Sequence, residues 1–183
     1  MKITRHSFTS LAMLPLLLTL LSPVTAFGQG SPSQTASVTI DGKAVSIRYS
    51  APSVRGRTIF GPNGILSQDP TYPVWRAGAN AATSFHTDAD LDINGLMVPK
   101  GDYTLYALIQ DPDNWKLVVN KEKGQWGLTY NASLDLGRVG MTMSKPAALV
   151  EMYKITLSAT GPKAGQLKLE WEHHIATVNF TIK

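Results

Sequence analysis

The segment Gln34–Ser50, QTASVTIDGKAVSIRYS, decides the fold of this chain. Two runs of alternating polar and apolar residues flank the pair Asp41–Gly42, and the second run places Val45, Ile47 and Tyr49 on one face. An Asp-Gly pair between two alternating runs is a strong signal for a β-hairpin, because both residues adopt positive φ angles at low cost. The segment therefore predicts two antiparallel strands with one apolar face turned toward a core.

The same pattern continues to the end of the chain. Alternating or strongly apolar runs, separated by Gly, Pro, Asn and Asp, predict further strands at 81–87, 90–93, 96–98, 103–110, 115–120, near 138–144, 149–160, 166–172 and 175–182. No helical period stands out beyond the first 26 residues. About nine or ten short strands with frequent turns indicate an all-β fold, an antiparallel β-sandwich of jelly-roll type in a single domain. The last strand is apolar enough to lie in the core, so we expect the C-terminus not to tolerate truncation.

The first 26 residues have the three parts of a secretory signal. Lys2 and Arg5 give a positive start, Leu11–Leu21 an apolar centre, and Val24–Ala26 a cleavage site of small residues. The apolar run is shorter than a membrane-spanning helix. We therefore expect an exported bacterial protein, periplasmic or extracellular, with no membrane anchor after signal removal. The expected organisation is a signal peptide at 1–26, a flexible lead-in at 27–33 and one domain at 34–183.

Composition excludes several function classes. The sequence has no cysteine, so it has no disulfide, no thiol nucleophile and no acceptor for a cysteine-linked lipid anchor. Its formal net charge is +4, and removal of Lys2 and Arg5 with the signal leaves +2. So small a charge, without a basic run, argues against a nucleic-acid partner.

The stretch Val74–His86, VWRAGANAATSFH, places an indole beside a guanidinium ahead of a bend of small residues. The preceding segment, Ala51–Pro73, is rich in Pro and Gly and is expected to form a long ordered loop. In this loop Arg55 and Arg57 flank a glycine. If the backbone is extended there, the two side chains point the same way about 6.6 Å apart. Such guanidinium groups suit a carboxylate, a phosphate or a sugar.

We therefore predict a ligand-facing group at Arg55, Arg57, Trp75, Arg76, Asn80, Thr83 and Trp126. Trp126 lies in a glycine-flanked loop, where an indole can serve as a stacking platform. Each residue also has a structural interpretation. The arginines can tie the loop to backbone carbonyls, Trp75 can lie in the core, Asn80 and Thr83 can hold the bend, and Trp126 can fold back as a lid. The sequence leaves both interpretations open.

Two other clusters are weaker candidates for a metal site. From Asp90, the run Asp88–Gly95 has oxygen side chains at calcium-loop spacing, but Gly101 stands where the closing glutamate belongs. On a strand the three aspartates of this run would share one solvent-facing side. His173 and His174 are adjacent and on a strand would face opposite sides, so His86 and Glu172 would have to complete any metal site there. We predict neither a metal nor a cofactor.

Five segments carry a family resemblance: SPSQTASVTIDGKAVSIRYSAPSVRGRTIFG at 31–61, VWRAGANAATSF at 74–85, GDYTLYALI at 101–109, NKEKGQWG at 120–127 and LEWE at 169–172. Together they resemble the bacterial "domain of unknown function 2911" family over nearly all of the mature chain. The RGR-x-IFG and WR-x-GAN-x-AT elements are the most distinctive. The resemblance implies an exported single-domain bacterial protein and assigns no activity.

Three functions fit the sequence. The first is binding of a small polar or anionic ligand such as a saccharide, which we favour. The second is a hydrolase acting on envelope or plant carbohydrate, although the chain has no nucleophile elbow. The third is a structural envelope component without a small-molecule site. Convergence of the arginines and Trp126 on one cleft would favour binding, an acid or histidine in that cleft would favour catalysis, and spread, paired arginines would favour a structural role.

Overall fold

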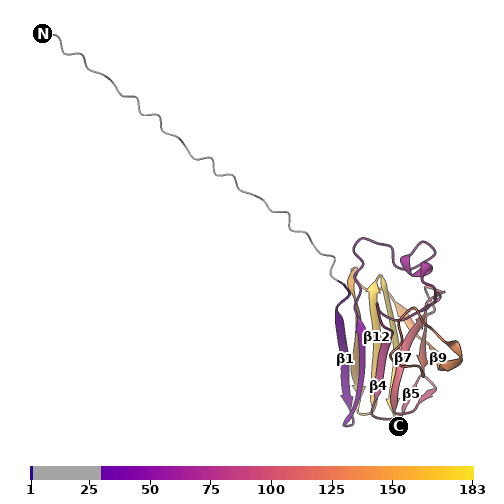
Figure 1. The fold of residues 1–183 in the computed structure, drawn as a ribbon. Helices are drawn as coiled ribbons and strands as arrows, with labels where there is room; N and C mark the ends of the chain where they lie inside the picture. Colours follow the sequence, from indigo (N-terminus) through magenta and orange to yellow (C-terminus); the bar gives the residue numbers. More distant parts are fainter. Residues whose placement is uncertain (2–29) are drawn as a thin grey trace.

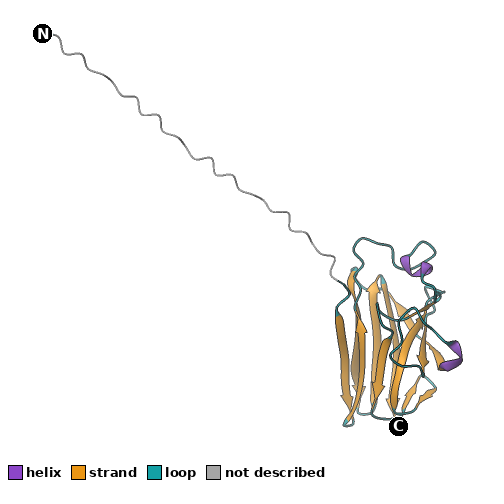
Figure 2. Cartoon of the chain, viewed as in Figure 1, coloured by secondary structure: helices purple, strands orange, loops and turns teal. Residues whose placement is uncertain are grey.

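The structure is a computed structural model that describes Met1 and residues 30–183, so the expected signal peptide and the start of the lead-in lie outside the described residues. Two antiparallel β-sheets pack face to face as an open sandwich (Figures 1 and 2). The described residues contain no α-helix, only two short 3₁₀ turns, η1 (Ile65–Gln68) and η2 (Ala132–Leu134). The prediction of an antiparallel β-sandwich is confirmed.

The first sheet has seven strands in the order β1-β2-β4-β7-β8-β9, with β3 beside β7. Their bounds are β1 (Ser33–Ile40), β2 (Lys43–Ser50), β3 (Val74–Trp75), β4 (Thr83–Thr87), β7 (Gly101–Leu108), β8 (Lys116–Asn120) and β9 (Asp135–Gly140). The β1–β2 hairpin turns at Asp41 and Gly42, whose φ angles are 50° and 70°. The turn chemistry of the sequence thus sets the register at one edge of the sheet.

The second sheet has six strands in the order β11-β12-β13-β5-β6, with β10 beside β13. Their bounds are β5 (Leu91–Ile93), β6 (Leu96–Val98), β10 (Thr142–Ser144), β11 (Val150–Gly161), β12 (Ala164–Glu172) and β13 (His174–Ile182). One strand was expected near 138–144, and the structure has β9 and β10 there in different sheets. The chain changes sheets at Met141, whose side chain is buried and whose N–H donates to the carbonyl of Trp115.

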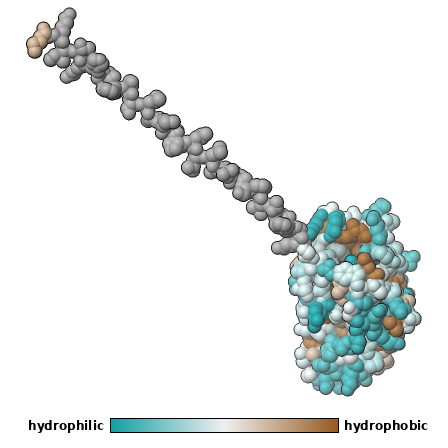
Figure 3. Space-filling view, viewed as in Figure 1, coloured by the Kyte–Doolittle hydropathy of each residue, from teal (hydrophilic) through white to brown (hydrophobic). Residues whose placement is uncertain are grey.

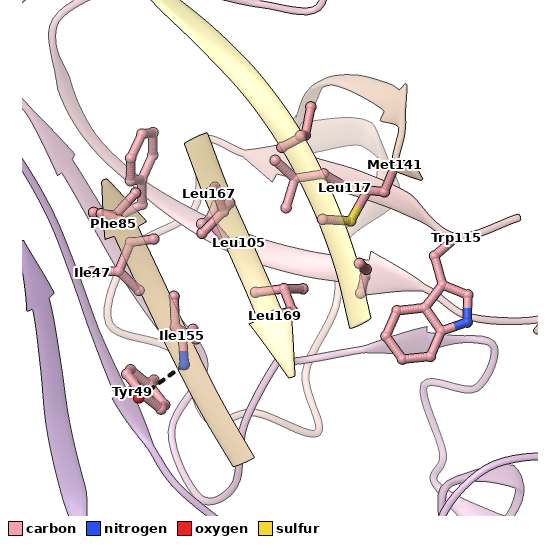
Figure 4. Packing of buried hydrophobic residues seen from close by; sticks show 14 of the residues in the cluster. Ile47, Tyr49, Phe85, Leu105, Trp115, Leu117, Met141, Ile155, Leu167 and Leu169 are labelled. Atoms are coloured by element: carbon pink, nitrogen blue, oxygen red, sulfur yellow. Dashed lines mark hydrogen bonds between the residues drawn. The ribbon is translucent and has the colours of Figure 1, made fainter. Parts of the chain in front are cut away.

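Apolar side chains from the inner faces of both sheets form one large core (Figure 4). The Ile155 N–H donates to Tyr49 Oη at 3.0 Å and so joins β11 to β2 across the sandwich. At one end the core is aromatic: Trp75 stacks on Trp171 with ring centroids 5.6 Å apart, and Phe60 packs edge-on against both. Burial of each large apolar side chain stabilises the folded state by about 1.5–3 kcal/mol.

The segment Ala51–Pro73 is a long loop without a strand, as the prolines and glycines predict. Ile59 and Phe60 are buried in the core, and the Ile59 N–H donates to Glu172 Oε1 at 3.0 Å. The loop therefore closes the aromatic end of the sandwich, and it is tied to the end of β12 by a side-chain carboxylate.

Candidate functional site

The predicted arginine pair lies in a turn rather than in extended backbone. Arg55 has a φ angle of 49° and Gly56 one of 67°, so the expected parallel projection of the two side chains is wrong. The Arg55 N–H donates to Glu151 Oε1 at 2.8 Å. The Arg57 guanidinium donates through Nε and Nη2 to carbonyls of its own loop, at 3.0 and 2.6 Å. This guanidinium holds the loop in the way that the structural interpretation described.

Trp75 and Thr83 are buried. Trp75 is 1% exposed and its Nε1 donates to the Gly78 carbonyl at 3.0 Å. Thr83 is 0% exposed and its Oγ1 donates to the Ala77 carbonyl at 2.8 Å. Both side chains fix the bend that follows β3, and neither presents a polar atom or a ring face to solvent.

Arg76, Asn80 and Trp126 do come together, around Gly127. The Gly127 N–H donates to the Asn80 carbonyl at 3.1 Å, and the Gly127 Cα packs so tightly on the Arg76 side chain that a Cβ would overlap it. Arg76 is paired through Nη1 with Asp69 Oδ2 at 2.9 Å. Trp126 is 57% exposed, so it does not fold back as a lid on the core. The indole of Trp126 is a large exposed surface available to a ligand.

A polar cleft of about 300 Å³ lies elsewhere, on the outer face of the seven-stranded sheet. It is lined by Ser46, Arg48, Ser84, Phe85, His86, Asp102, Tyr103, Lys123 and Gly124. Cross-strand register assembles it: Arg48 lies opposite Ser84, Ser46 lies opposite His86, and His86 lies opposite Asp102. Because alternate residues of a strand share a face, β2, β4 and β7 present these side chains on one surface.

His86 is held between two carboxylates at this cleft. Its Nδ1 lies 2.7 Å from Asp102 Oδ1 and its Nε2 lies 3.1 Å from Asp88 Oδ1. The hydrogen bond to Asp102, followed by the one to Asp88, raises the pKa of His86. In turn the His86 hydrogen bond lowers the pKa of Asp88, with help from the Ala44 N–H. An imidazole with a carboxylate at each nitrogen is a double donor, so His86 is favoured as a cation.

The cleft therefore combines cations with hydroxyl groups. Arg48 and Lys123 are exposed, His86 belongs to the same lining, and Ser46 and Ser84 add hydroxyls. Sequence reasoning missed this site, although alternation in 43–50 already places Arg48 on the face opposite the apolar one. What no sequence pattern reveals is the pairing of β4 with β2 on one side and β7 on the other, which brings the three strands together.

The other sequence clusters lie differently from expectation. Asp88 follows β4 and Asp90 precedes β5, so with Asp92 they do not line one face of a strand. They bind backbone N–H groups instead, of Ala44, Lys100 and Gly95 respectively. Within residues 30–183 no three histidine or acidic side chains are placed to hold a metal ion.

His173 and His174 line one cleft, contrary to expectation, because Trp171 pairs with His174 and the two residues between them form a tight turn. This second cleft, of about 210 Å³, is smaller than the first. The two histidines are therefore available to one ligand, which their adjacency on a strand would have prevented.

The face of the domain in Figure 3 is mainly hydrophilic, with its apolar residues in small patches. In the part of the chain that the structure describes, no helix has the length and apolar character needed to span a bilayer.

A family model described as "Protein of unknown function (DUF2911)" matches residues 31–180. The match covers the whole sandwich except the end of β13. No curated protein and no solved structure matches the chain.

Proposed function

This chain belongs to the DUF2911 family of proteins of unknown function, and we propose, from its N-terminal sequence and the geometry of its sheet, that it is an exported protein that binds a small acidic saccharide. The proposed site is the cleft across β2, β4 and β7, which we call the β2–β4–β7 cleft. The observation that supports it is the meeting of Arg48 and Lys123 with two serine hydroxyls on one side of the sheet.

The charge of the lining favours an anionic group on the ligand. A guanidinium such as that of Arg48 binds a carboxylate through two parallel N–H···O bonds, and an ammonium such as that of Lys123 adds a point charge. His86 contacts both Asp102 and Asp88, so its one positive charge offsets one of these two carboxylates, and Arg48 and Lys123 together outweigh the other. The local balance is therefore positive, and electrostatic attraction raises the association rate of an anion.

The remaining lining favours hydroxyl groups on the same ligand. Ser46 and Ser84 can both donate and accept hydrogen bonds, and the Asp102 carboxylate can accept from a sugar hydroxyl. A volume of about 300 Å³ lies at the small end of ligand pockets, which suits one sugar ring. A carboxylate and several hydroxyls on one ring describe a uronic acid.

Export is part of the proposal and rests on the sequence of residues 1–26. The positive start, the apolar centre and the small residues before Phe27 are those of a cleaved secretory signal. A saccharide ligand is consistent with a protein that works in the bacterial envelope or outside the cell.

A thermal-shift comparison of the mature protein, residues 27–183, tests the proposal. D-glucuronate is the probe, with D-glucose and acetate as the neutral and hydroxyl-free controls. At a hundredfold excess over the dissociation constant, a ligand stabilises by about 2.7 kcal/mol. We expect glucuronate to raise the melting temperature of the wild type and of Arg55→Gln, and to raise that of Arg48→Gln much less. If glucuronate still raises the melting temperature of Arg48→Gln but not that of Arg55→Gln, the ligand binds at the loop arginines and not at the β2–β4–β7 cleft.

A structural envelope role is the alternative. Arg57 and Arg76 are each bonded within the fold, as expected of residues that build rather than bind. If none of the three probes shifts the wild type, this alternative is preferred over the β2–β4–β7 cleft.

A further inference from the structure

The second cleft, at the turn between β12 and β13, has a chemistry of its own. It is lined by Pro112, Asp113, Met143, Ser144, Lys145, His173 and His174. Strand β10 brings Ser144 beside the start of β13, because Ser144 pairs with Ile175. Two imidazoles, an ammonium, a hydroxyl and a carboxylate thus meet around about 210 Å³, next to the aromatic end of the core.

His174 is fixed in orientation by its neighbours. Its ring stacks on Trp115, with centroids 5.4 Å apart and planes 13° apart, and packs on Phe60 at 4.6 Å. Nδ1 is buried, has no hydrogen-bond partner among the described residues, and lies 3.6 Å from Glu172 Oε2. With Nδ1 turned inward, the edge of the ring that carries Nε2 is the one left to the cleft.

Glu172 is itself held in place. Its Oε1 accepts the Ile59 N–H at 3.0 Å, and its φ angle is 52°, in a region that non-glycine residues seldom adopt. Such backbone strain persists where surrounding structure enforces it, and it is common at functional sites. The turn places the Glu172 carboxylate 3.6 Å from Nδ1 of His174, within ion-pair distance but beyond a hydrogen bond, so Glu172 acts on the imidazole through its charge.

We propose that this cleft is a hydrolytic site for small acyl esters, with His174 as the general base and Glu172 as its positioning residue. Nε2 of His174 takes a proton from water, and the water oxygen bonds to the ester carbonyl carbon as the C=O π pair moves to oxygen. When that pair returns, the bond to the leaving oxygen breaks, and this oxygen takes the proton from Nε2. Lys145 supplies positive charge for the transient oxyanion.

The protonation state of His174 agrees with this role. Burial is the largest influence on the pKa of His174 and lowers it. The positive charges of His173 and Lys145 lower this pKa further, whereas the negative charges of Glu172 and Asp113 raise it. The neutral ring, which can accept a proton, is therefore favoured. By contrast, the raised pKa and two carboxylate partners of His86 leave it no free nitrogen for such a step.

The test measures hydrolysis of p-nitrophenyl acetate by the mature protein between pH 4.5 and 8.5. We expect the rate to rise with pH through a midpoint below 6.5, the ordinary pKa of histidine. His174→Gln should lower the rate at pH 7 at least about tenfold, a small part of what general bases contribute. Lys163→Gln, at an exposed residue that lines neither cleft, is the control and should keep the wild-type rate. Circular dichroism verifies that each variant is folded.

Glu172→Gln distinguishes positioning from simple support of the fold. The amide still accepts the Ile59 N–H but has no charge, so the pKa of His174 should fall further and the midpoint should move to lower pH. A wild-type midpoint at or above 6.5, or a folded His174→Gln with the wild-type rate, would overturn the proposal. Neither result depends on glucuronate binding at the β2–β4–β7 cleft.

Discussion

The four tryptophans illustrate how residues of one type divide between core and surface. Trp75, Trp115 and Trp171 are at most 3% exposed, whereas Trp126 is 57% exposed. Alternation in the sequence predicts that Trp115 and Trp171 lie on strands, at least half-buried. It does not separate Trp75 from Trp126, because both adjoin glycine-containing bends and only the packing of distant strands buries one of them.

The first prediction compares these two indoles. Trp75→Ala removes a ring that packs on Phe60, Tyr153 and Trp171, and should lower the free energy of unfolding by about 3–5 kcal/mol. Trp126→Ala should change it by no more than about 0.5 kcal/mol, as is usual for an exposed position. Urea unfolding measures both. Equal losses would mean that Trp126 belongs to the core.

Among the secondary-structure elements, the hairpins were the most predictable from the sequence, because their turn residues are easily recognised. The bounds of β2, β6 and the Asp41–Gly42 turn agree with the sequence prediction. In the described range there are thirteen strands rather than nine or ten. The short strands β3 and β10 show no alternation and, unlike the three-residue strands β5 and β6, are not joined by a recognisable turn such as Asn94–Gly95. The β2–β4–β7 cleft was not predictable either, since β2 and β4 are separated by a loop of irregular sequence.

The second prediction concerns the link between β4 and β7. Because the pKa of His86 is raised in the folded protein, its contribution to stability is complete below about 6.5, the unfolded value. That contribution is lost as the pH rises through the higher folded value. The stability difference between the wild type and His86→Gln should therefore shrink from pH 5.5 to pH 8.5, measured by urea unfolding. A difference that grows with pH would show that His86 is neutral when folded.

At the scale of the whole molecule, β13 holds the second sheet together. It pairs with β12 on one side and with β5 and β10 on the other, and its apolar residues lie in the core. Loss of β13 would remove the pairing of β10 and would leave β12 and β5 each with an unpaired edge. This position explains structurally why we expect the C-terminus not to tolerate truncation.

The third prediction follows from that position. Deletion of residues 174–183 should leave the mature chain unfolded or insoluble, because it removes a central strand and its buried side chains. Deletion of Lys183 alone removes one exposed side chain paired with Asp92, and should keep the fold. Circular dichroism and size-exclusion chromatography compare the two. A folded, soluble shorter chain would refute the central role of β13.

The central claim is that an acidic saccharide binds at the β2–β4–β7 cleft, and amide NMR during a glucuronate titration tests it most directly. We predict that the amide signals of Ser46, Arg48, Ser84 and Lys123 shift in a saturable manner, and that equal concentrations of glucose leave them in place. Saturable shifts confined to Arg55–Thr58 or to the second cleft around His174, with the signals of β2 and β4 unchanged, would contradict this claim.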